Sequence, residues 1–237
     1  MKQINLSSAL LTVSNISKSF HYKSVLKNIH FSLSPGETIA LIGKNGAGKS
    51  TLLRILAKIS TPENGQVEFE NNNILTGMAA NRQGIYYCGH APGFYPSLTA
   101  GQNLNYISAF HGCSNTTEKI SSILQDYHLF DAIDEPVKVY SQGMLQRLKL
   151  AMIELIDWSL LLIDEPFNSL DMAGREFVKN KMQAWQNGKR CILFVDHDIK
   201  RALELSSRIL LLDKHSIAMD EPTSSPSLVV KITEFME

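Results

Sequence analysis

Apolar and polar residues alternate in two stretches of the first 70 residues. Leu11 and Val13 alternate with polar neighbours at the start of residues 10–36, and residues 66–70 alternate again after the turn-forming residues 62–65. A period of two is typical of strands that bury only one face. The pattern predicts half-exposed antiparallel strands beside the core of the domain.

Continuous apolar runs indicate a second class of strand. The runs cover residues 38–42, 155–163, 191–195 and 208–212, and residues 84–88 are a further short strand candidate. Runs of this length without alternation predict strands that are buried on both faces, as in a parallel sheet.

Helical patterns fill much of the remaining sequence. Residues 99–157 have a helical pattern that is interrupted by a polar loop near residues 111–117, and residues 171–187 are expected to form a crossover helix between buried strands. Residues 220–237 open with proline and serine and are expected to form a short accessory tail. Together these segments predict an α/β fold with a parallel sheet.

Composition narrows the possible functions. The chain has 237 residues, enough for one α/β domain, and its 23 Lys and Arg residues balance 23 Asp and Glu residues. This balance gives no general attraction to nucleic acid. We see neither a membrane-spanning run nor, in residues 1–6, the apolar segment of a signal peptide. Cys88, Cys113 and Cys191 are widely spaced, which favours reduced thiols over a metal site or a disulfide framework.

A glycine-rich loop follows the predicted strand 38–42 and precedes a helical pattern. It has the form G-x-x-x-x-G-K-S and consists of Gly43, Lys44, Asn45, Gly46, Ala47, Gly48, Lys49 and Ser50. Glycines let the backbone curl around phosphates, and the helix start offers free amides and a positive dipole end. Lys49 would reach the β- and γ-phosphates and Ser50 would bind Mg²⁺. A glycine-rich turn without a ligand is the alternative, but the strand, loop and helix together indicate a nucleoside triphosphate site.

Two acidic residues end the apolar run at residues 155–163. Asp164 and Glu165 are followed by Pro166. The carboxyl ends of parallel strands are where ligands bind in open α/β sheets. Asp164 is suited to hold Mg²⁺ and Glu165 to orient or deprotonate an attacking water. The same residues would otherwise simply end a strand.

A possible second anion site lies at residues 141–152. Ser141 fits a helix N-cap and Gly143 allows close approach of another backbone, so the helix start is able to receive an anion. Taken alone, the pattern is also typical of an ordinary capped helix.

The order of these three motifs resembles the ABC-type ATPases, the nucleotide-binding subunits of ABC transporters. The resemblance covers residues 10–220 and implies a P-loop NTPase fold with a parallel-sheet core, an N-terminal antiparallel β subdomain and a helical signature subdomain. It divides the single domain into a core of residues 1–90 and 155–220, a Q-loop and helical part of residues 91–154, and a tail of residues 221–237.

The resemblance also implies a role for each matching residue. Phe20, with Tyr22 as a weaker candidate, would stack on adenine, and residues 43–51, ending at Thr51, match Walker A. Two chains would close head to tail around two ATP molecules. The remaining matches are Ser141, Gln142 and Gly143 of the signature, Asp164 of Walker B, the catalytic Glu165, Asp171 of the D-loop at residues 168–171, and the switch residue His197. Without the resemblance, His197 is a polar residue after a buried strand.

Two positions depart from the common family pattern. Gln142 stands where the signature usually has glycine, which would weaken or reorient the contact with the partner's phosphate. His90 occupies the expected Q-loop glutamine position. Histidine still accepts a hydrogen bond from a metal-bound water, but it is sensitive to protonation where glutamine is not. A loop histidine with local bonds is the alternative.

The Gly-His-x-Pro-Gly sequence at residues 89–93 looks like that of the haem-exporter ATPases of cytochrome c maturation. The resemblance implies ATP and Mg²⁺ as ligands, a separate membrane permease, a second identical ATPase chain, no nucleic acid, and a peripheral location on the cytoplasmic face of the cell membrane. Other exporters of drugs or polysaccharides share the signature. A switch that hydrolyses little ATP stays open, whereas chromosome, repair and translation relatives carry insertions or tandem cores that this sequence lacks.

Overall fold

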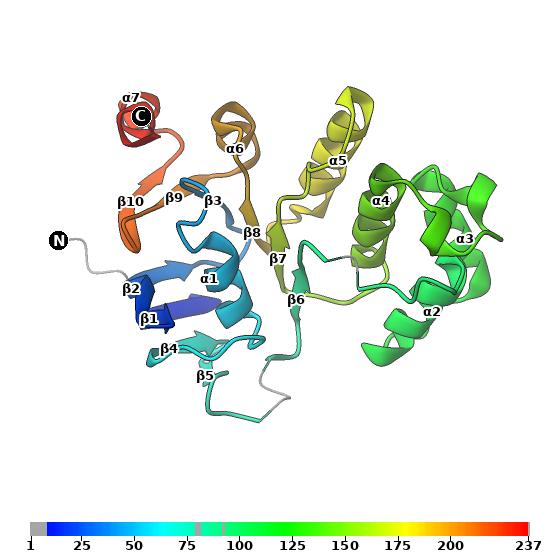
Figure 1. Cartoon of the computed structure of the whole chain (residues 1–237), viewed down its shortest axis with the longest axis horizontal. Helices are drawn as coiled ribbons and strands as arrows, with labels where there is room; N and C mark the ends of the chain where they lie inside the picture. The colour runs from blue at the N-terminus through cyan, green and yellow to red at the C-terminus, as the bar shows by residue number, and fades with distance from the viewer. Residues whose placement is uncertain (1–8, 79–81, 92, 237) are drawn as a thin grey trace.

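The computed structural model describes residues 9–78, 82–91 and 93–236. A four-stranded antiparallel sheet has the order β2-β1-β4-β5, and a six-stranded sheet has the order β10-β9-β3-β8-β7-β6 (Figure 1). The antiparallel sheet contains β1 (Leu11–Phe20), β2 (Lys23–Leu33), β4 (Asn64–Phe69) and β5 (Asn72–Asn73). The expected half-exposed antiparallel strands are therefore present.

Five strands of the larger sheet are parallel. They are β9 (Arg208–Asp213), β3 (Thr38–Ile42), β8 (Cys191–Val195), β7 (Leu160–Asp164) and β6 (Ile85–Cys88). Residues alternate between two cores along these strands: Leu160 and Leu162 pack toward the antiparallel sheet, and Leu161 and Ile163 toward the helices. Burial on both faces explains the unbroken apolar runs.

Helices pack on the larger sheet, and a further group of helices lies beside its β6 edge. Helix α1 (Lys49–Leu56) packs between the two sheets, whereas α2 (Ala100–Phe110), α3 (Thr117–Asp126) and α4 (Gln142–Ile153) form a separate group beyond β6 (Figure 1). The crossover helix α5 (Met172–Trp185) and the short α6 (Ile199–Leu205) complete this side. Short turns of 3₁₀ helix at Phe130–Ala132 and Val137–Val139 connect α3 to α4.

Two segments differ from the sequence-based expectation. The apolar run 155–163 becomes a strand only at Leu160; its first part is a buried turn in which Trp158 stacks edge-on against Trp185, with ring centroids 6.4 Å apart. The expected tail instead contains part of β10 (Ser216–Pro222), which pairs antiparallel with β9, and α7 (Leu228–Met236), which buries Leu228 and Ile232 in the helix-side core.

Candidate nucleotide-binding site

The loop between β3 and α1 curls around the side chain of Lys49. Lys49 is 6% exposed, and its Nζ donates to the carbonyl oxygens of Gly43 at 2.8 Å and Lys44 at 3.0 Å. Gly48, with φ of 108°, begins α1 without a side-chain cap. The first amides of α1 and the positive end of its dipole therefore remain available to an anion.

Gly43 is required by the packing of the loop against β9. Its φ is 148°, and a Cβ atom there would lie 2.3 Å from the carbonyl oxygen of Leu212. Residues with a side chain are strained in this conformation and would collide with backbone. The loop is thus held against the sheet at its first glycine, while Lys44, Asn45 and Gly46 are exposed at its tip.

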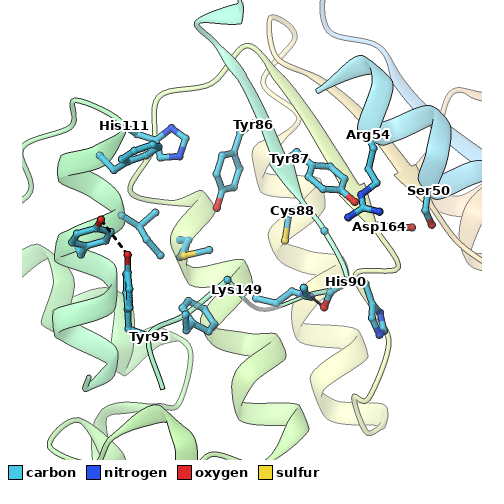
Figure 2. Close-up of a pocket in the computed structure, with 18 residues that line it drawn as sticks. Ser50, Arg54, Tyr86, Tyr87, Cys88, His90, Tyr95, His111, Lys149 and Asp164 are labelled. Atoms are coloured by element: carbon cyan, nitrogen blue, oxygen red, sulfur yellow. Dashed lines mark hydrogen bonds between the residues drawn. The ribbon is translucent and has the colours of Figure 1, made fainter. Parts of the chain in front are cut away.

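Asp164 ends β7 next to the start of α1. It is 4% exposed, and among the described residues its Oδ1 atom has no hydrogen-bond partner. Asp164 and Ser50 line the same hollow of about 870 Å³ and lie side by side in Figure 2. A buried carboxylate oxygen without a partner, beside a hydroxyl, fits a Mg²⁺ ion, because Mg²⁺ binds oxygen ligands.

The acids and the phosphate loop belong to one site. Burial lowers the pKa of Lys49, and the nearby negative charges of Glu165 and Asp164 oppose that effect. The order of the strands explains the proximity, because β7 and β3 flank β8 and both end at the same edge of the sheet.

Glu165 is held by side chains from two other loops. Its Oε1 lies 2.8 Å from Nε2 of His197, and its Oε2 accepts a hydrogen bond of 3.2 Å from Nδ2 of Asn168. The backbone of Glu165 is left-handed, with φ of 55°, which costs about 1 kcal/mol for a residue with a side chain. The strained turn thus carries a carboxylate that contacts His197 and Asn168.

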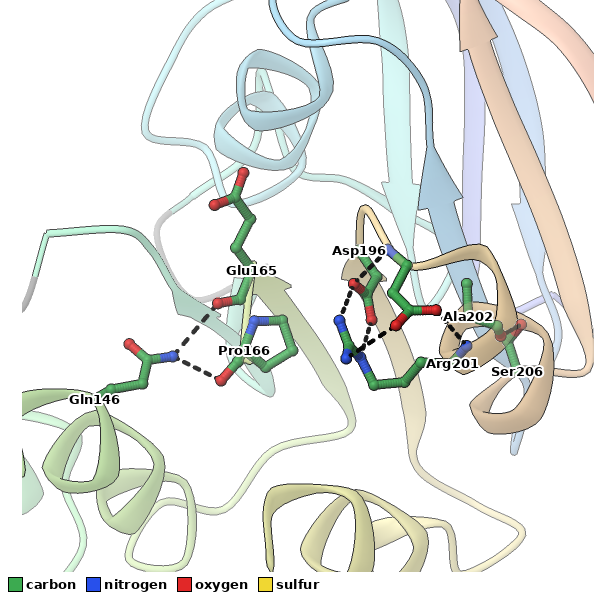
Figure 3. A network of polar contacts seen from close by, with 8 residues as sticks. Gln146, Glu165, Pro166, Asp196, Arg201, Ala202 and Ser206 are labelled. Carbon is green, nitrogen blue, oxygen red and sulfur yellow. Dashed lines mark hydrogen bonds and ion pairs between the residues drawn. The ribbon is translucent and has the colours of Figure 1, made fainter. Parts of the chain in front are cut away.

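A second network fixes the loop that carries His197. Asp196 is 4% exposed and accepts two hydrogen bonds of 2.6 Å from Arg201 (Figure 3). The guanidinium group of Arg201 also lies 4.2 Å from the ring centroid of Phe167, which follows Glu165 by two residues. Arg201 therefore ties the turn after β8 to the turn after β7.

The signature segment lies apart from this site. Ser141 caps α4 by accepting a hydrogen bond of 3.2 Å from the amide of Met144. Ser141 and Gly143 line a second hollow of about 400 Å³ together with Ser169 and Asp171, and Asp171 caps α5 through the amide of Gly174. Neither Ser50 nor Asp164 lines it. Within one chain, the structure brings the signature to the D-loop and not to the phosphate loop.

The remaining site residues predicted from the sequence lie around the Lys49 and Asp164 cluster and not within it. His90 is exposed and lines the large hollow, together with a smaller hollow that includes Gln142. Phe20 ends β1 with 47% of its surface exposed and has Lys18 Nζ 5.0 Å from its ring centroid; Tyr22 is fully exposed. Thr51 lies in the first turn of α1. Pro92 of the Gly-His-x-Pro-Gly sequence lies outside the described residues.

Sequence reasoning missed four side chains around the site. Asp196 and Arg201 have the i, i+5 spacing of a pair that closes over a helix start, and Gln146 and Lys149 are polar residues within the apolar face of α4. The pairing of Asp196 with Arg201 is local, whereas the partners of Gln146 and Lys149 are carbonyl oxygens in distant segments, which the sequence of α4 does not indicate.

A curled glycine loop between a parallel strand and a helix, facing two acids at the same sheet edge, defines a P-loop NTPase. The model of the ABC transporter family matches residues 26–168, and the chain belongs to this family of ATPases.

Two similar sequences and one similar solved structure are examples of the proteins that this chain matches. "Uncharacterized ABC transporter ATP-binding protein YdbJ" of Bacillus subtilis (strain 168) is 31% identical over 209 residues, which is 88% of this chain and 68% of the relative. "Cytochrome c biogenesis ATP-binding export protein CcmA" of Cupriavidus pinatubonensis (strain JMP 134 / LMG 1197) is 36% identical over 149 residues, or 63% of this chain and 66% of the relative. The solved "Structure of ATP binding subunit of ABC transporter" has a TM-score of 0.84 and 23% identity, and the match covers 95% of this chain and 94% of the other.

The structure and the comparisons confirm the expected fold: a P-loop NTPase core with an antiparallel sheet and a helical group. They also confirm the ATPase assignment. Of the helices in the described ranges, none combines the length and the apolar character needed to cross a bilayer.

Proposed function

We propose that this chain is the ATP-hydrolysing subunit of a transporter and acts as a head-to-tail dimer that drives a separate membrane permease. The observation that carries the proposal is the separation of two half-sites. Ser50 and Asp164 line one hollow, and the charges of Asp164 and Glu165 act on the neighbouring Lys49, whereas Ser141 and Gly143 line another hollow. Each chain is then incomplete, and a second copy supplies the signature to the first copy's ATP.

Each residue of the site has a chemical role in this proposal. Lys49 binds the β- and γ-phosphates, and Ser50 and Asp164 hold Mg²⁺, which offsets phosphate charge when bound. Glu165 takes the proton of a water whose oxygen attacks the γ-phosphorus, while ADP leaves. His197 contacts the γ-phosphate and keeps Glu165 oriented through their 2.8 Å contact.

Glu165→Gln tests the catalytic role. It retains shape and ATP binding, so phosphate release should fall about 100- to 10,000-fold, the range that general-base catalysis contributes. The variant should also accumulate a closed dimer with ATP, measured by light scattering after size exclusion. The matched control is Glu176→Gln, because Glu176 is 63% exposed on α5. Undiminished phosphate release by the Glu165 variant would contradict the assignment.

Lys49→Ala tests the phosphate loop independently. The two carbonyls that hold this ammonium belong to the loop, so the variant should lose triphosphate binding measured by calorimetry. Normal ATP affinity would remove the loop from the proposed site.

The permease is proposed to dock on the aromatic end of the large hollow. Tyr95, Tyr106 and Phe110 are 47%, 50% and 77% exposed there, on and beside α2. Exposed apolar clusters of this kind mark interaction surfaces. The chain is accordingly proposed to be peripheral, on the cytoplasmic face of the cell membrane, without a nucleic-acid partner. Phe110→Asp should abolish co-purification with the permease and leave basal ATPase activity unchanged; retained co-purification would place the dock elsewhere.

Haem export in cytochrome c maturation is the more specific form of the proposal. It is supported by the match to the cytochrome c biogenesis relative and by the Gly-His-x-Pro-Gly sequence at residues 89–93. Purification from membranes tests it: permease subunits accompanied by a haem chaperone of cytochrome maturation are expected. Permeases of a drug or polysaccharide exporter would assign the ATPase to that system.

A switch that hydrolyses little ATP is the second candidate, and Gln142 and His90 favour it. Gln142 is exposed at the first turn of α4, where a partner's phosphate would approach. Gln142→Gly and His90→Gln restore the common pattern. Raised turnover in these variants would support the switch, and unchanged turnover would favour the transporter ATPase.

A further inference from the structure

The signature helix α4 contains two buried polar side chains that the proposed chemistry does not use. Seven residues of α4 are buried, and five of them are apolar; the other two are Gln146, 7% exposed, and Lys149, 5% exposed. Burying polar groups is unfavourable unless they are hydrogen-bonded, so their partners matter.

Both side chains bind main-chain carbonyls of catalytic loops. Nε2 of Gln146 donates to the carbonyl oxygen of Pro166 at 2.8 Å and lies 3.4 Å from that of Glu165 (Figure 3). Nζ of Lys149 donates to the carbonyl oxygen of His90 at 3.1 Å. One helix thus contacts both the turn that carries Glu165 and the Q-loop of the same chain.

The spacing of these residues puts them on one side of α4. Gln142, Gln146 and Lys149 are separated by four and three residues, which places them in line along a helix. All three line one hollow of about 140 Å³ with His90 and Asn168. The row begins at the helix end where the partner's ATP is proposed to bind and continues to the loops of the chain's own site.

We propose that Gln146 and Lys149 are positioning residues that transmit the binding of the partner's ATP at the N-terminus of α4 to the Glu165 turn and the Q-loop of the same chain. The inference rests on the proposed head-to-tail dimer. An α-helix moves as a rigid unit over this distance, so a shift at Ser141 displaces both carbonyls together. The two ATP sites of the dimer are then coupled through α4.

Near-isosteric replacements test the coupling. Gln146→Met and Lys149→Met remove the donors and keep the volume, with Gln125→Met and Lys138→Met, both at exposed positions, as controls. Wild-type turnover should depend on ATP with a Hill coefficient between about 1 and 2, as two coupled sites allow. Each test variant should lower this coefficient toward about 1 and reduce turnover about 2- to 30-fold, the range of measured site couplings. Lys149→Arg, which keeps a donor, should retain more activity than Lys149→Met.

Single-chain ATP affinity and melting temperature separate positioning from general damage. Affinity should be unchanged, because neither residue contacts the phosphate loop. An unchanged Hill coefficient in both methionine variants would overturn the inference, as would equal losses of affinity, melting temperature and turnover.

A mixed dimer tests the inference without altering α4. A ¹⁵N-labelled Lys49→Ala chain, which is expected not to bind ATP itself, is paired with an unlabelled wild-type chain, and hydrogen exchange is followed in the labelled chain. ATP on the partner should slow exchange at residues 141–145 and also at residues 89–91. Slowing confined to residues 141–145 overturns the coupling but not the dimer. No slowing anywhere in the labelled chain overturns the proposed dimer and the inference with it.

Discussion

Glu154 is expected to be the most important charged residue for the stability of the helical group. It is the C-cap of α4, and its carboxylate accepts hydrogen bonds from the Tyr127 hydroxyl at 3.0 Å and from Nε1 of Trp185 at 3.1 Å. Lys181 Nζ lies 3.4 Å from the same carboxylate. These partners come from the end of α3 and from α5, so one side chain joins three helices.

The cost of removing this carboxylate follows from the burial of its partners. Tyr127 is 0% and Trp185 5% exposed, so Glu154→Ala leaves two buried donors unpaired, at about 1–3 kcal/mol each. Glu154→Gln keeps an acceptor but weakens two charge-assisted bonds by about 1 kcal/mol each and loses a partly exposed ion pair worth about 0.5 kcal/mol. We expect destabilisation of about 4 kcal/mol for alanine and about 2.5 kcal/mol for glutamine.

Thermal and urea unfolding measure both changes. At about 2–4 °C per kcal/mol for a chain of this size, the melting temperature should fall by about 8–16 °C for Glu154→Ala and about 5–10 °C for Glu154→Gln. ATP affinity should not change. Glu176→Ala is the control, because its contact with Lys179 is 3.7 Å long and exposed and is worth less than about 1 kcal/mol. A loss below about 1 kcal/mol for Glu154→Ala would refute the reasoning.

Three further predictions concern the glycine loop, the thiols and the loop after β8. Gly43→Ala should destabilise the chain by about 3 kcal/mol, because the new Cβ meets the backbone of β9, whereas Gly112→Ala, with open space around it, should cost about 1 kcal/mol; equal melting temperatures would contradict this. Burial raises the pKa of Cys88 to about 11, so only about a thousandth is thiolate at pH 8. Iodoacetamide should therefore label Cys113, which is partly exposed, well before Cys88, and mass spectrometry would expose the reverse order. Arg201→Met leaves the buried Asp196 carboxylate without its cationic partner and should lower the free energy of unfolding by about 3 kcal/mol. Phosphate release, measured below the melting temperature, should fall about 100-fold. Unchanged stability and unchanged phosphate release would show that the Asp196–Arg201 pair does not position the loop.

The fold was predictable from sequence where one local signal sufficed. Residues 38–42 and 191–195 form short, mostly apolar segments that contain several β-branched residues, and each forms a strand buried on both faces. The predicted start of the strand at residues 160–164 is five positions too early because Leu155, Ile156 and Trp158 are also apolar. These three side chains are buried in a turn, and buried apolar side chains in a turn give the same sequence signal as those in a strand.

The C-terminal residues show why long-range pairing escapes sequence analysis. Residues 216–222 contain Asp220 and Glu221, which do not suggest a sheet strand. In the structure, Arg208 pairs with Asp220 on the neighbouring strand, and Lys231 pairs with Glu221. The charges are satisfied by cross-strand and helix contacts that only the folded chain creates.

Long-range contacts also limit how much of the nucleotide-binding site the sequence can predict. The glycine loop and the acids were identifiable because their residue types follow from phosphate and Mg²⁺ chemistry. Lys149 and Gln146 were not, because they bind main-chain carbonyls, and a carbonyl has no sequence signature. Such residues are found only when the positions of the loops are known.

The arrangement of Asp164 and Glu165 explains why several distant elements support one sheet edge. Asp164 has a buried oxygen for which the described part of the chain supplies no hydrogen-bond partner, and Glu165 has a left-handed backbone; both features destabilise the isolated chain. They persist only because neighbouring contacts hold the turn: His197 from the loop after β8, Asn168 from the D-loop, and Gln146 from α4. Since each contact comes from a different element, movement of any one of them reaches the Glu165 turn. A turn held in this way suits the proposed ATPase, whose activity would respond to a second chain and to a membrane permease.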